Sequence, residues 1–375
     1  MKIKTKLRSC LKATLLLLTI LCFPAKADAL VFQVDGIFYS THEDDPTTVS
    51  VATSGEVYDA ETNEYVNVHH NVSGSVTIPS TVTYNGFTYT VTGIEGMAFS
   101  HYSALTDISI PETVTEIGTG AFDETGLWEQ QQGIIYADKW AVGCKGYMSL
   151  DPIIKEGTIG IANHAFDVTR CSPFNNAVVI PNSVLYIGQG AFITLFGCAS
   201  PIKSITIGEN VQLIRAGAFY TGSECWTAGS LAGQVNLQQI TCLAKVPPRT
   251  TSVYGAQGAF AGLNEYCEKH GGWTEIYEDN DYAIYNKVPL AVPFESVEAY
   301  KNAPDWSRFK TIIAIISYNC DVNGDNEVTV SDINAVVDVI TKGPSHPNYN
   351  NCDVNEDGEV SVADINLIVD AIVGD

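Results

Sequence analysis

The sequence is poor in basic residues. Its 375 residues include 20 Lys and Arg against 43 Asp and Glu, which gives a formal net charge of −23. This excess of carboxylates repels a phosphate backbone, so the composition argues against nucleic-acid binding, and anionic membrane surfaces are disfavoured for the same reason. Charged residues make up only 17% of the chain, whereas 45% are hydrophobic. A disordered acidic tail has the opposite balance, so the sequence predicts a folded protein.

Motifs of the common enzyme classes are also lacking. The sequence has no phosphate-binding Gly loop followed by Lys-Ser/Thr, no zinc-protease motif and no nucleophile elbow. His69 and His70 adjoin on a predicted strand, where successive side chains point to opposite faces, so they make a poor metal pair. Cys267 and His270 are neighbours in sequence only, without a recognisable third residue to orient them. We therefore expect no enzymatic activity.

Long apolar runs are lacking as well. The run from Ala13 to Phe23 has about eleven residues, whereas a bilayer-spanning helix needs about twenty. Basic residues precede this run, and Ala25-Lys26-Ala27 after it has the small-x-small pattern that a signal peptidase accepts. We predict a signal peptide over residues 1–27, cleaved near Ala27, and a secreted or cell-surface protein without a transmembrane segment. The pattern leaves a periplasmic or an extracellular destination open.

The middle of the chain is repetitive. The dipeptide Ala-Phe occurs six times, and its Ala stands at positions 98, 121, 165, 191, 218 and 259. The intervals of 23, 44, 26, 27 and 41 residues indicate one repeat with two insertions. Each unit is predicted to contain a strand closed by Pro or Gly, a tight turn, a second apolar segment and Ala-Phe in a helical turn. Because one such unit cannot bury its apolar face alone, we expect the units to stack.

The motif Leu105-Thr-x-Ile-x-Ile-Pro111-x-x-Val114-Thr-x-Ile117-Gly118-x-x-Ala121-Phe122 resembles the BspA-like leucine-rich repeat family of bacterial surface proteins, over roughly residues 75–316. The resemblance implies a mainly β solenoid over residues 93–316, with a parallel sheet and short helical turns. It also implies binding of a host or matrix protein, or of a glycan, through the exposed sheet face. Residues 28–92 alternate apolar and polar side chains around the hairpin signals Asp35-Gly36 and Asn85-Gly86, so we predict a β-rich N-terminal cap there.

Two features of this region leave alternatives open. The aromatic side chains of the insertions could bind sugar rings, but we favour packing onto the repeats; they are Trp128, Tyr136, Trp140 and Tyr147 in residues 123–150, and Tyr266, Trp273, Tyr277, Tyr282 and Tyr285 in residues 263–287. Cysteines recur at an interval of 27 residues at positions 171, 198 and 225, which suggests a repeated buried position. Disulfides between stacked neighbours also remain possible.

The C-terminus contains two copies of one acidic loop, which begin 32 residues apart at Asp321 and Asp353. Oxygen-bearing side chains fall at loop positions 1, 3, 5, 9 and 12, and calcium takes six to eight oxygen ligands from a loop of this length. Position 6, where the chain turns sharply, is Asn326 in one copy and Gly358 in the other. We assign one Ca²⁺ to Asp321, Asn323, Asp325 and Asp332, with the Glu327 carbonyl and Thr329, and a second Ca²⁺ to Asp353, Asn355, Asp357 and Asp364, with the Glu359 carbonyl and Ser361.

Each loop is followed by an apolar-periodic helix, formed by Ile333, Val336, Val337 and Ile340 in one copy and Ile365, Ile368, Val369 and Ile372 in the other. A duplicated loop-helix unit resembles a type I dockerin, here over residues 317–375. The resemblance implies a small all-α calcium-binding domain that docks onto a cohesin-bearing scaffold protein. Loop positions 10 and 11, often hydroxyl-bearing in that family, are Val330-Ser331 and Val362-Ala363. The equivalent Cys320 and Cys352 form a clasp between the two halves or serve as apolar packing residues.

Two functions fit this organisation. The first is an exported, non-catalytic binding or adhesion protein whose repeats recognise a protein or a glycan and whose dockerin supplies calcium-dependent docking. The second is an accessory component of a polysaccharide-degrading, cellulosome-like assembly, attached to its scaffold by the dockerin. They differ in which end of the chain supplies the specific contact.

Overall fold

The computed structural model describes residues 29–59, 64–146, 153–166, 176–192, 202–219, 237–253, 256–260, 281–315, 319–325, 327–355 and 357–373. The predicted signal peptide lies outside these residues, as do Cys171, Cys198, Cys225, Cys267 and His270. The chain divides into two compact units, Met1–Ile313 and Ala314–Asp375. No helix within the described ranges is long and apolar enough to cross a membrane.

Two tight hairpins open the first unit. Strands β1 (Val31–Val34) and β2 (Ile37–Thr41) pair antiparallel around Asp35-Gly36, and β7 (Thr81–Tyr84) and β8 (Phe87–Ile94) pair around Asn85-Gly86. Both residues of each turn have positive φ, with values of 49° and 81° in the first and 49° and 82° in the second. A two-residue hairpin loop requires this backbone conformation. Both predicted turns are therefore confirmed.

These hairpins belong to one mixed sheet. Its order is β1-β2-β3-β8-β10, with β7 paired to β8, and both β3 (Thr48–Val51) and β10 (Glu116–Ile117) run parallel to β8. The sheet thus continues from the N-terminal strands into the first Ala-Phe repeats. A separate hairpin is formed by β4 (Gly55–Asp59) and β5 (Glu64–Val68). His69 and His70 follow β5 and do not lie on a strand, contrary to our prediction.

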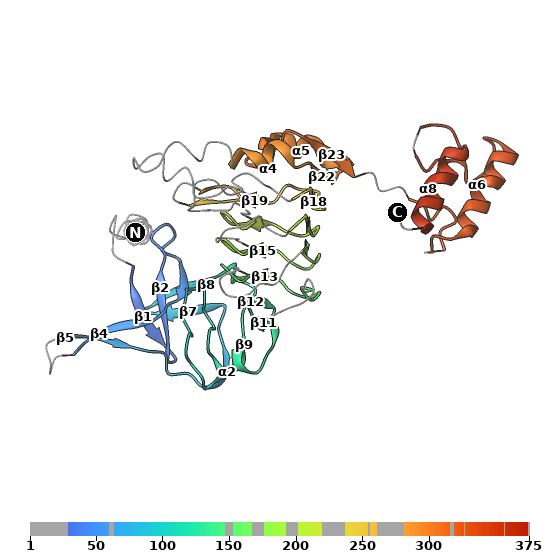
Figure 1. Cartoon of the computed structure of the whole chain (residues 1–375). Coiled ribbons are helices and arrows are strands. Elements are labelled where there is room, and N and C mark those ends of the chain that lie inside the picture. The colour runs from blue at the N-terminus through green and yellow to red at the C-terminus, as the bar shows by residue number, and fades with distance from the viewer. Residues whose placement is uncertain are drawn as a thin grey trace, which may run out of the picture. The chain divides into compact units, whose positions relative to one another are not determined.

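The repeats supply two series of short strands. In the first series, Val178, Ile205, Ile240 and Leu290 are register partners in successive parallel strands. In the second, Ile161, Ile187, Ile214 and Thr250 are register partners. The first series comprises β14 (Ala177–Val179), β16 (Ser204–Ile207), β18 (Gln239–Cys242), β22 (Leu290–Pro293) and β23 (Ile312–Ile315), and the second β13 (Gly160–Ile161), β15 (Tyr186–Ile187), β17 (Leu213–Ile214) and β19 (Arg249–Thr250). Successive strands of the second series lie in successive layers (Figure 1).

The prediction of a β-rich repeat fold is confirmed, but the sheets are mixed. In the sheet of the second series the reason is the insertion after Phe122, which forms the short helix α2 (Gly126–Glu129) and an antiparallel hairpin of β11 (Gly133–Ala137) and β12 (Trp140–Lys145). Strand β12 then runs parallel to β13 and so extends the second series. Smaller pairs complete the unit: β6 (Gly74–Thr77) with β9 (Leu105–Ser109), and β20 (Ser252–Val253) with β21 (Ala256–Gln257).

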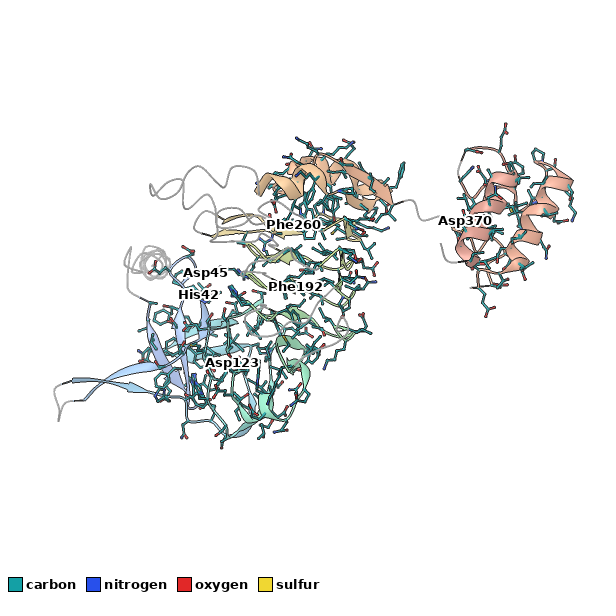
Figure 2. All side chains as sticks on the ribbon, viewed as in Figure 1. His42, Asp45, Asp123, Phe192, Phe260 and Asp370 are labelled. Carbon is teal, nitrogen blue, oxygen red and sulfur yellow. The ribbon has the colours of Figure 1, made fainter. Side chains whose placement is uncertain are left out.

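The Ala-Phe dipeptides form the interior of the stack. In each of the first five, the Ala N–H donates to a carbonyl three residues earlier, as from Ala191 to Gly188 at 3.3 Å, which makes a single turn where we predicted a helical one. All six Phe rings are buried, and ring centroids of stacked neighbours are 5.1–5.6 Å apart. Phe192 and Phe260 mark this column inside the repeats (Figure 2). Offset-stacked rings at this spacing combine area burial with a favourable aromatic geometry.

The described aromatic side chains of the insertions pack onto the repeats. Trp140 is 1% exposed and stacks on Tyr186, and Trp128 lies so close to Gly143 that a Cβ there would be 2.6 Å from its ring. Tyr285 in the second insertion is also buried. Packing, the interpretation we favoured, is confirmed for these side chains, whereas the side chains of Tyr147, Tyr266, Trp273, Tyr277 and Tyr282 lie outside those that the structure describes. Cys144 on β12 is disulfide-bonded.

A closing segment covers the last repeat. It contains α4 (Asp281–Lys287), the 3-10 helices η1 (Phe294–Ser296) and η2 (Trp306–Arg308), and α5 (Val297–Asn302). Asp305 joins this segment to the final Ala-Phe turn, because its carboxylate accepts hydrogen bonds from Tyr285 Oη and from the Ala259 N–H. Burial raises the pKa of Asp305. Trp306 donates from Nε1 to the Pro248 carbonyl at 2.8 Å, so its polar atom is satisfied inside the core.

The second unit is helical in its described part. It contains α6 (Val330–Lys342), the short α7 (Tyr349–Cys352) and α8 (Val362–Val373). Helices α6 and α8 both follow an acidic loop, as predicted. Their shared core is small, which makes the loops important for its stability. The buried members of this core are Cys320, Val322, Val336, Val339, Cys352, Val354 and Ile368.

We expect Gly188→Ala to destabilise the repeat region by about 1–3 kcal/mol, the range for overpacking a close-packed interior. A Cβ at this position would lie 2.5 Å from Asn163 N and 2.6 Å from the Ala162 carbonyl carbon, so the neighbouring repeat's backbone would have to move. The matched control is Gly86→Ala, which adds a methyl group with no atom within 4 Å and costs only the positive-φ strain of about 1 kcal/mol. Thermal unfolding measures both. A smaller loss for Gly188→Ala than for Gly86→Ala would contradict the close approach.

Candidate metal centre

The first acidic loop is organised by its own side chains. Asp321 Oδ1 accepts hydrogen bonds from Gly324 N at 2.8 Å and Asp325 N at 3.1 Å, and Asn323 Oδ1 accepts from Asp325 N at 2.8 Å. Asp325 Oδ1 in turn accepts from Glu327 N at 2.9 Å. Short side-chain oxygens that bond to nearby backbone N–H groups are typical of tight turns. The predicted ligands at positions 1, 3 and 5 therefore lie on one compact turn.

The second loop repeats this arrangement. Asp353 accepts from Asp357 N at 3.2 Å and Gly358 N at 3.0 Å, and Asn355 Oδ1 accepts from Asp357 N at 3.0 Å. Asp357 Oδ1 accepts from Glu359 N at 2.9 Å. Gly358 has a φ of 92°, which is the left-handed conformation that we expected at position 6. The two copies thus share their local structure as well as their sequence.

The aspartates at position 12 are fully buried. Asp332 Oδ1 accepts from Val322 N at 3.0 Å and Asn323 N at 3.2 Å, while its Oδ2 accepts from Thr329 N at 2.9 Å. Asp364 makes the equivalent bonds to Val354 N, Asn355 N and Ser361 N, at 2.7, 3.1 and 2.7 Å. A buried carboxylate is stable only when hydrogen bonds of this kind replace its hydration. Each aspartate therefore connects the start of its loop to the start of the following helix.

Thr329 and Ser361 have a second role that our sequence analysis missed. Thr329 Oγ1 accepts from Ser331 N at 3.1 Å, and Ser361 Oγ accepts from Ala363 N at 3.1 Å, so both hydroxyls cap the helix that follows. Together with the aspartate three residues later they form a capping box. The pattern Ser/Thr-x-x-Asp before an apolar helix could have revealed this role. Glu327 and Glu359 have exposed side chains, which is compatible with a contribution through their carbonyls alone.

The donor set fits a hard cation. Each loop offers carboxylate, amide and carbonyl oxygens within twelve residues, and these are the ligands that calcium prefers. Across the described ranges, no group of three His, Cys, Asp or Glu side chains is gathered closely enough to hold a metal ion. The carboxylates are instead directed at backbone N–H groups. Carboxylate and amide oxygens each have two lone pairs, so the Asp side chains at positions 1, 5 and 12 and the Asn side chain at position 3 keep a lone pair for an ion after a local convergence.

The two cysteines of this unit are free. Cys320 and Cys352 are buried in the small core, and Cys320 Sγ lies 3.7 Å from the Leu367 carbonyl oxygen. Burial raises the pKa of both thiols, and the carboxylate of Asp332 acts in the same direction on each. A neutral buried thiol behaves as a small apolar group. Cys320 and Cys352 are therefore apolar packing residues, one of our two alternatives, and do not form a disulfide clasp between the two halves.

Both long helices also have an exposed apolar stripe. Val337 on α6 is 43% exposed and its counterpart Val369 on α8 is 37% exposed, although helical periodicity placed them with the core residues. Neighbouring apolar positions of the two copies are exposed in the same way. The exposed members are Val330, Val337 and Ile340 on α6, and Val362, Val369, Ile372 and Val373 on α8. We call these two sets the α6 stripe and the α8 stripe.

Comparisons with known proteins identify both parts of the chain. Residues 75–132 and 151–240 match the BspA type leucine rich repeat region, in six copies, and residues 319–372 match the dockerin type I domain. The chain carries a BspA-type leucine-rich repeat region and a type I dockerin domain. These families are binding and docking modules and not enzymatic domains, and type I dockerin domains bind calcium. The dockerin match includes both acidic loops.

Solved structures of leucine-rich repeat proteins are similar over most of the chain. One from Bacteroides ovatus is 21% identical, with 77% of this chain and 69% of that chain covered and a TM-score of 0.23. A leucine rich cell surface protein from Faecalibacterium prausnitzii is 13% identical, with coverage of 78% and 96% and a TM-score of 0.24. The pneumococcal vaccine antigen PcpA is 11% identical, with coverage of 78% and 100% and a TM-score of 0.23. The comparison with curated proteins found no match.

We expect Asp332→Asn to destabilise the dockerin domain by about 2 kcal/mol or more, because one buried and two partly buried N–H groups lose a charged acceptor. The measurement is thermal unfolding in saturating calcium, followed by circular dichroism at 222 nm. Asp338→Asn, on the exposed side of the same helix, is the matched control and should shift the midpoint little. Equal shifts in the two variants would show that the buried hydrogen bonds do not organise the loop.

Proposed function

We propose that this chain is an exported, non-catalytic binding protein that attaches to a partner through a calcium-loaded dockerin domain. The observation that carries the proposal is the pairing of two acidic loops with two equivalent exposed apolar stripes in the domain that matches type I dockerins. An apolar helix face in water is an interaction surface by default. Its duplication, together with that of the loops, makes docking the best-supported function.

The proposed metal sites follow the two loops. One Ca²⁺ is held by Asp321, Asn323, Asp325 and Asp332, with the Glu327 carbonyl and a contribution from Thr329; the other is held by Asp353, Asn355, Asp357 and Asp364, with the Glu359 carbonyl and a contribution from Ser361. When bound, the ions neutralise carboxylates that repel one another within each loop. The protein's own part is to hold the loop ends together through the buried Asp332 and Asp364. Binding energy in such a small domain is also folding energy.

Isothermal titration of the full chain should therefore give two calcium ions per molecule. Asp321→Ala and Asp353→Ala should each remove one of them, whereas Asp370→Asn, which changes an exposed carboxylate on α8 outside both loops, should leave two. A chelator should reduce the helical signal at 222 nm, because the loops no longer hold α6 and α8 in place. A circular-dichroism spectrum that is unchanged by the chelator would contradict coupled binding and folding.

For the partner we propose a cohesin-bearing scaffold protein. Support comes from the dockerin match and from the α6 and α8 stripes, which include loop position 10 of each copy at Val330 and Val362. Hydroxyl groups are scarce at these positions, so contact through them is apolar. The partner's surface should be basic at its rim, because Lys342 is the only Lys or Arg among residues 317–375 and its Nζ is bonded to Asp338 at 2.6 Å.

The docking test uses immobilised recombinant cohesin domains and the full chain, in calcium and in chelator. The double variant Val337→Asp/Val369→Asp should raise the Kd at least about tenfold, because it places a charge in whichever stripe is used. Val179→Asp, at an exposed valine in the repeat region, is the control and should bind as the unchanged chain does. Calcium-independent capture, or capture that survives the double variant, would contradict docking through these helices.

The repeat region is proposed to be a solenoid over residues 93–316, preceded by the β-rich cap of residues 28–92, that recognises a protein or a glycan. The aromatic side chains described in the insertions are buried or half-buried against the core, so they do not favour sugar binding there. The dockerin favours the second candidate function, an accessory component of a polysaccharide-degrading assembly. Capture by a cohesin scaffold supports that candidate, whereas failure of every cohesin to bind supports adhesion through the repeats.

The proposed route to the cell surface or the medium is the signal peptide of residues 1–27, with cleavage near Ala27. The basic start, the short apolar run and the small-x-small pattern support it. N-terminal sequencing of the mature protein would identify the cleavage position.

A further inference from the structure

His70 is a buried histidine between the N-terminal strands and the first Ala-Phe turn. It is 6% exposed and follows β5. Its Nε2 lies 2.9 Å from the Ala52 carbonyl oxygen, and its Nδ1 lies 3.1 Å from the Phe38 backbone nitrogen. A carbonyl only accepts and a backbone N–H only donates. The proton is therefore on Nε2, and the lone pair of Nδ1 accepts from Phe38.

Three separate segments meet at this ring. Phe38 belongs to β2, and Ala52 follows β3. The ring centroid lies 4.9 Å from that of Phe99, the first Phe of the aromatic column, and 5.7 Å from that of Tyr102. The backbone N–H of His70 also donates to Tyr102 Oη at 2.8 Å. His70 thus connects the strands that cover the first repeat to the repeat itself.

We propose that His70 is a pH-sensitive joint that holds the N-terminal strands against the first repeat while it is neutral and releases them when Nδ1 is protonated. Protonation puts an N–H group on Nδ1 opposite the N–H group of Phe38. Two donors then face each other, and a positive charge is buried beside apolar rings. The repulsion between these two donors is relieved only if β2 moves away from the ring, because neither the protonated Nδ1 nor the Phe38 amide can act as an acceptor. This inference is independent of the proposed docking function.

His42, which directly follows β2, provides a contrast. Its Nδ1 and Nε2 each lie 2.8 Å from a hydroxyl oxygen, those of Thr48 and Ser50 (His42 is labelled in Figure 2). A hydroxyl both donates and accepts, so Ser50 can rotate its proton away and accept from a protonated ring. Protonation of His42 therefore leaves its hydrogen bonds intact. The difference between the two histidines is the fixed polarity of the backbone partners of His70.

The net effect of the surroundings of His70 is to disfavour a positive charge on its ring. Burial lowers the pKa of His70, the carbonyls of Ala52 and Ala98 oppose this shift, and His69 lowers the pKa further. From the first Ala-Phe turn, Tyr102 faces the ring, and burial raises the pKa of its phenol, so it stays neutral. Beside Ala52, the carboxylate of Glu95 accepts from Thr53 N at 3.1 Å.

The remaining charged pair at this junction, between His101 and Glu124, lies at the surface. No carboxylate among the described side chains is hydrogen-bonded to the His70 ring. The charged ring would therefore lack the carboxylate partner that normally compensates a buried positive charge.

The direction of the pH effect follows from this shift. The pKa of His70 is lower in the closed state than the ordinary value of 6.5, so opening takes up a proton. The joint is fully closed above pH 6.5 and weakens as the pH falls from there toward the lowered pKa. Within that window, each unit of pH multiplies the opening constant by about ten, because one proton is bound on opening.

The experiment is amide hydrogen exchange of the full chain in saturating calcium between pH 7.5 and 5, with rates corrected for the intrinsic pH dependence of exchange. We expect the protection of the Phe38 amide to fall by about tenfold per pH unit below pH 6.5. His70→Asn, whose Oδ1 keeps an acceptor near Phe38 but does not titrate, should abolish this dependence. His42→Gln is the matched control and should retain it.

A second measurement decides the matter if His70→Asn does not fold. The ring of His70 is titrated by NMR in the unchanged chain, and its pKa should lie below 6.5. A pKa at or above 6.5 would overturn the proposal. So would Phe38 protection that does not depend on pH, or a dependence that persists in His70→Asn or disappears in His42→Gln.

Discussion

Close approach between consecutive repeats is the constraint on which the first unit depends. The residue before Ala-Phe has positive φ in every repeat, and the Ala itself is small enough for its turn to lie against the next one. The Phe rings then stack, as Phe192 and Phe219 do with centroids 5.4 Å apart, and the buried Ile and Leu side chains of the two strand series continue the same layers. Any side chain added between turns would separate the layers and expose several rings at once. Small residues here are therefore as important for the core as large ones.

The second unit depends on polar contacts instead, because its buried apolar core is small. Its loops are held by carboxylates that accept backbone hydrogen bonds, and two of these carboxylates, Asp332 and Asp364, are as buried as the core valines. The acidic residues of these loops therefore have a structural role of their own. The small core uses only one face of each helix, so apolar residues on the other face of α6 and α8 are exposed.

Features that express a local requirement were predictable from the sequence. Asn85-Gly86 predicts a tight turn whose two residues need positive φ. The recurring Ala-Phe dipeptides predict that equivalent Phe rings stack in successive layers. The tight turns of the two acidic loops were predictable for the same reason, because their short side-chain oxygens accept from nearby backbone N–H groups. Features that depend on distant partners were not. Val337 and Val339 are equally apolar, and only the packing of the rest of the small core decides that the second is buried and the first exposed. The three hydrogen bonds of Asp332 and the antiparallel pairing of β11 with β12 depend likewise on contacts between segments that local sequence patterns do not specify.

The hairpin of β11 and β12 has a consequence for the continuity of the repeat stack. It separates two repeats by an interval of 44 residues, yet the Asn163 N–H donates directly to the Ile117 carbonyl at 2.9 Å, as it would if nothing intervened. The stack is therefore continuous in space where it is interrupted in sequence. The extra chain at this junction joins the sheet, because β12 is the parallel neighbour of β13 and β11 forms the edge. The insertion therefore adds buried side chains of its own, among them Ile135 and Trp140, to the core, while the repeats on either side of it remain in direct contact.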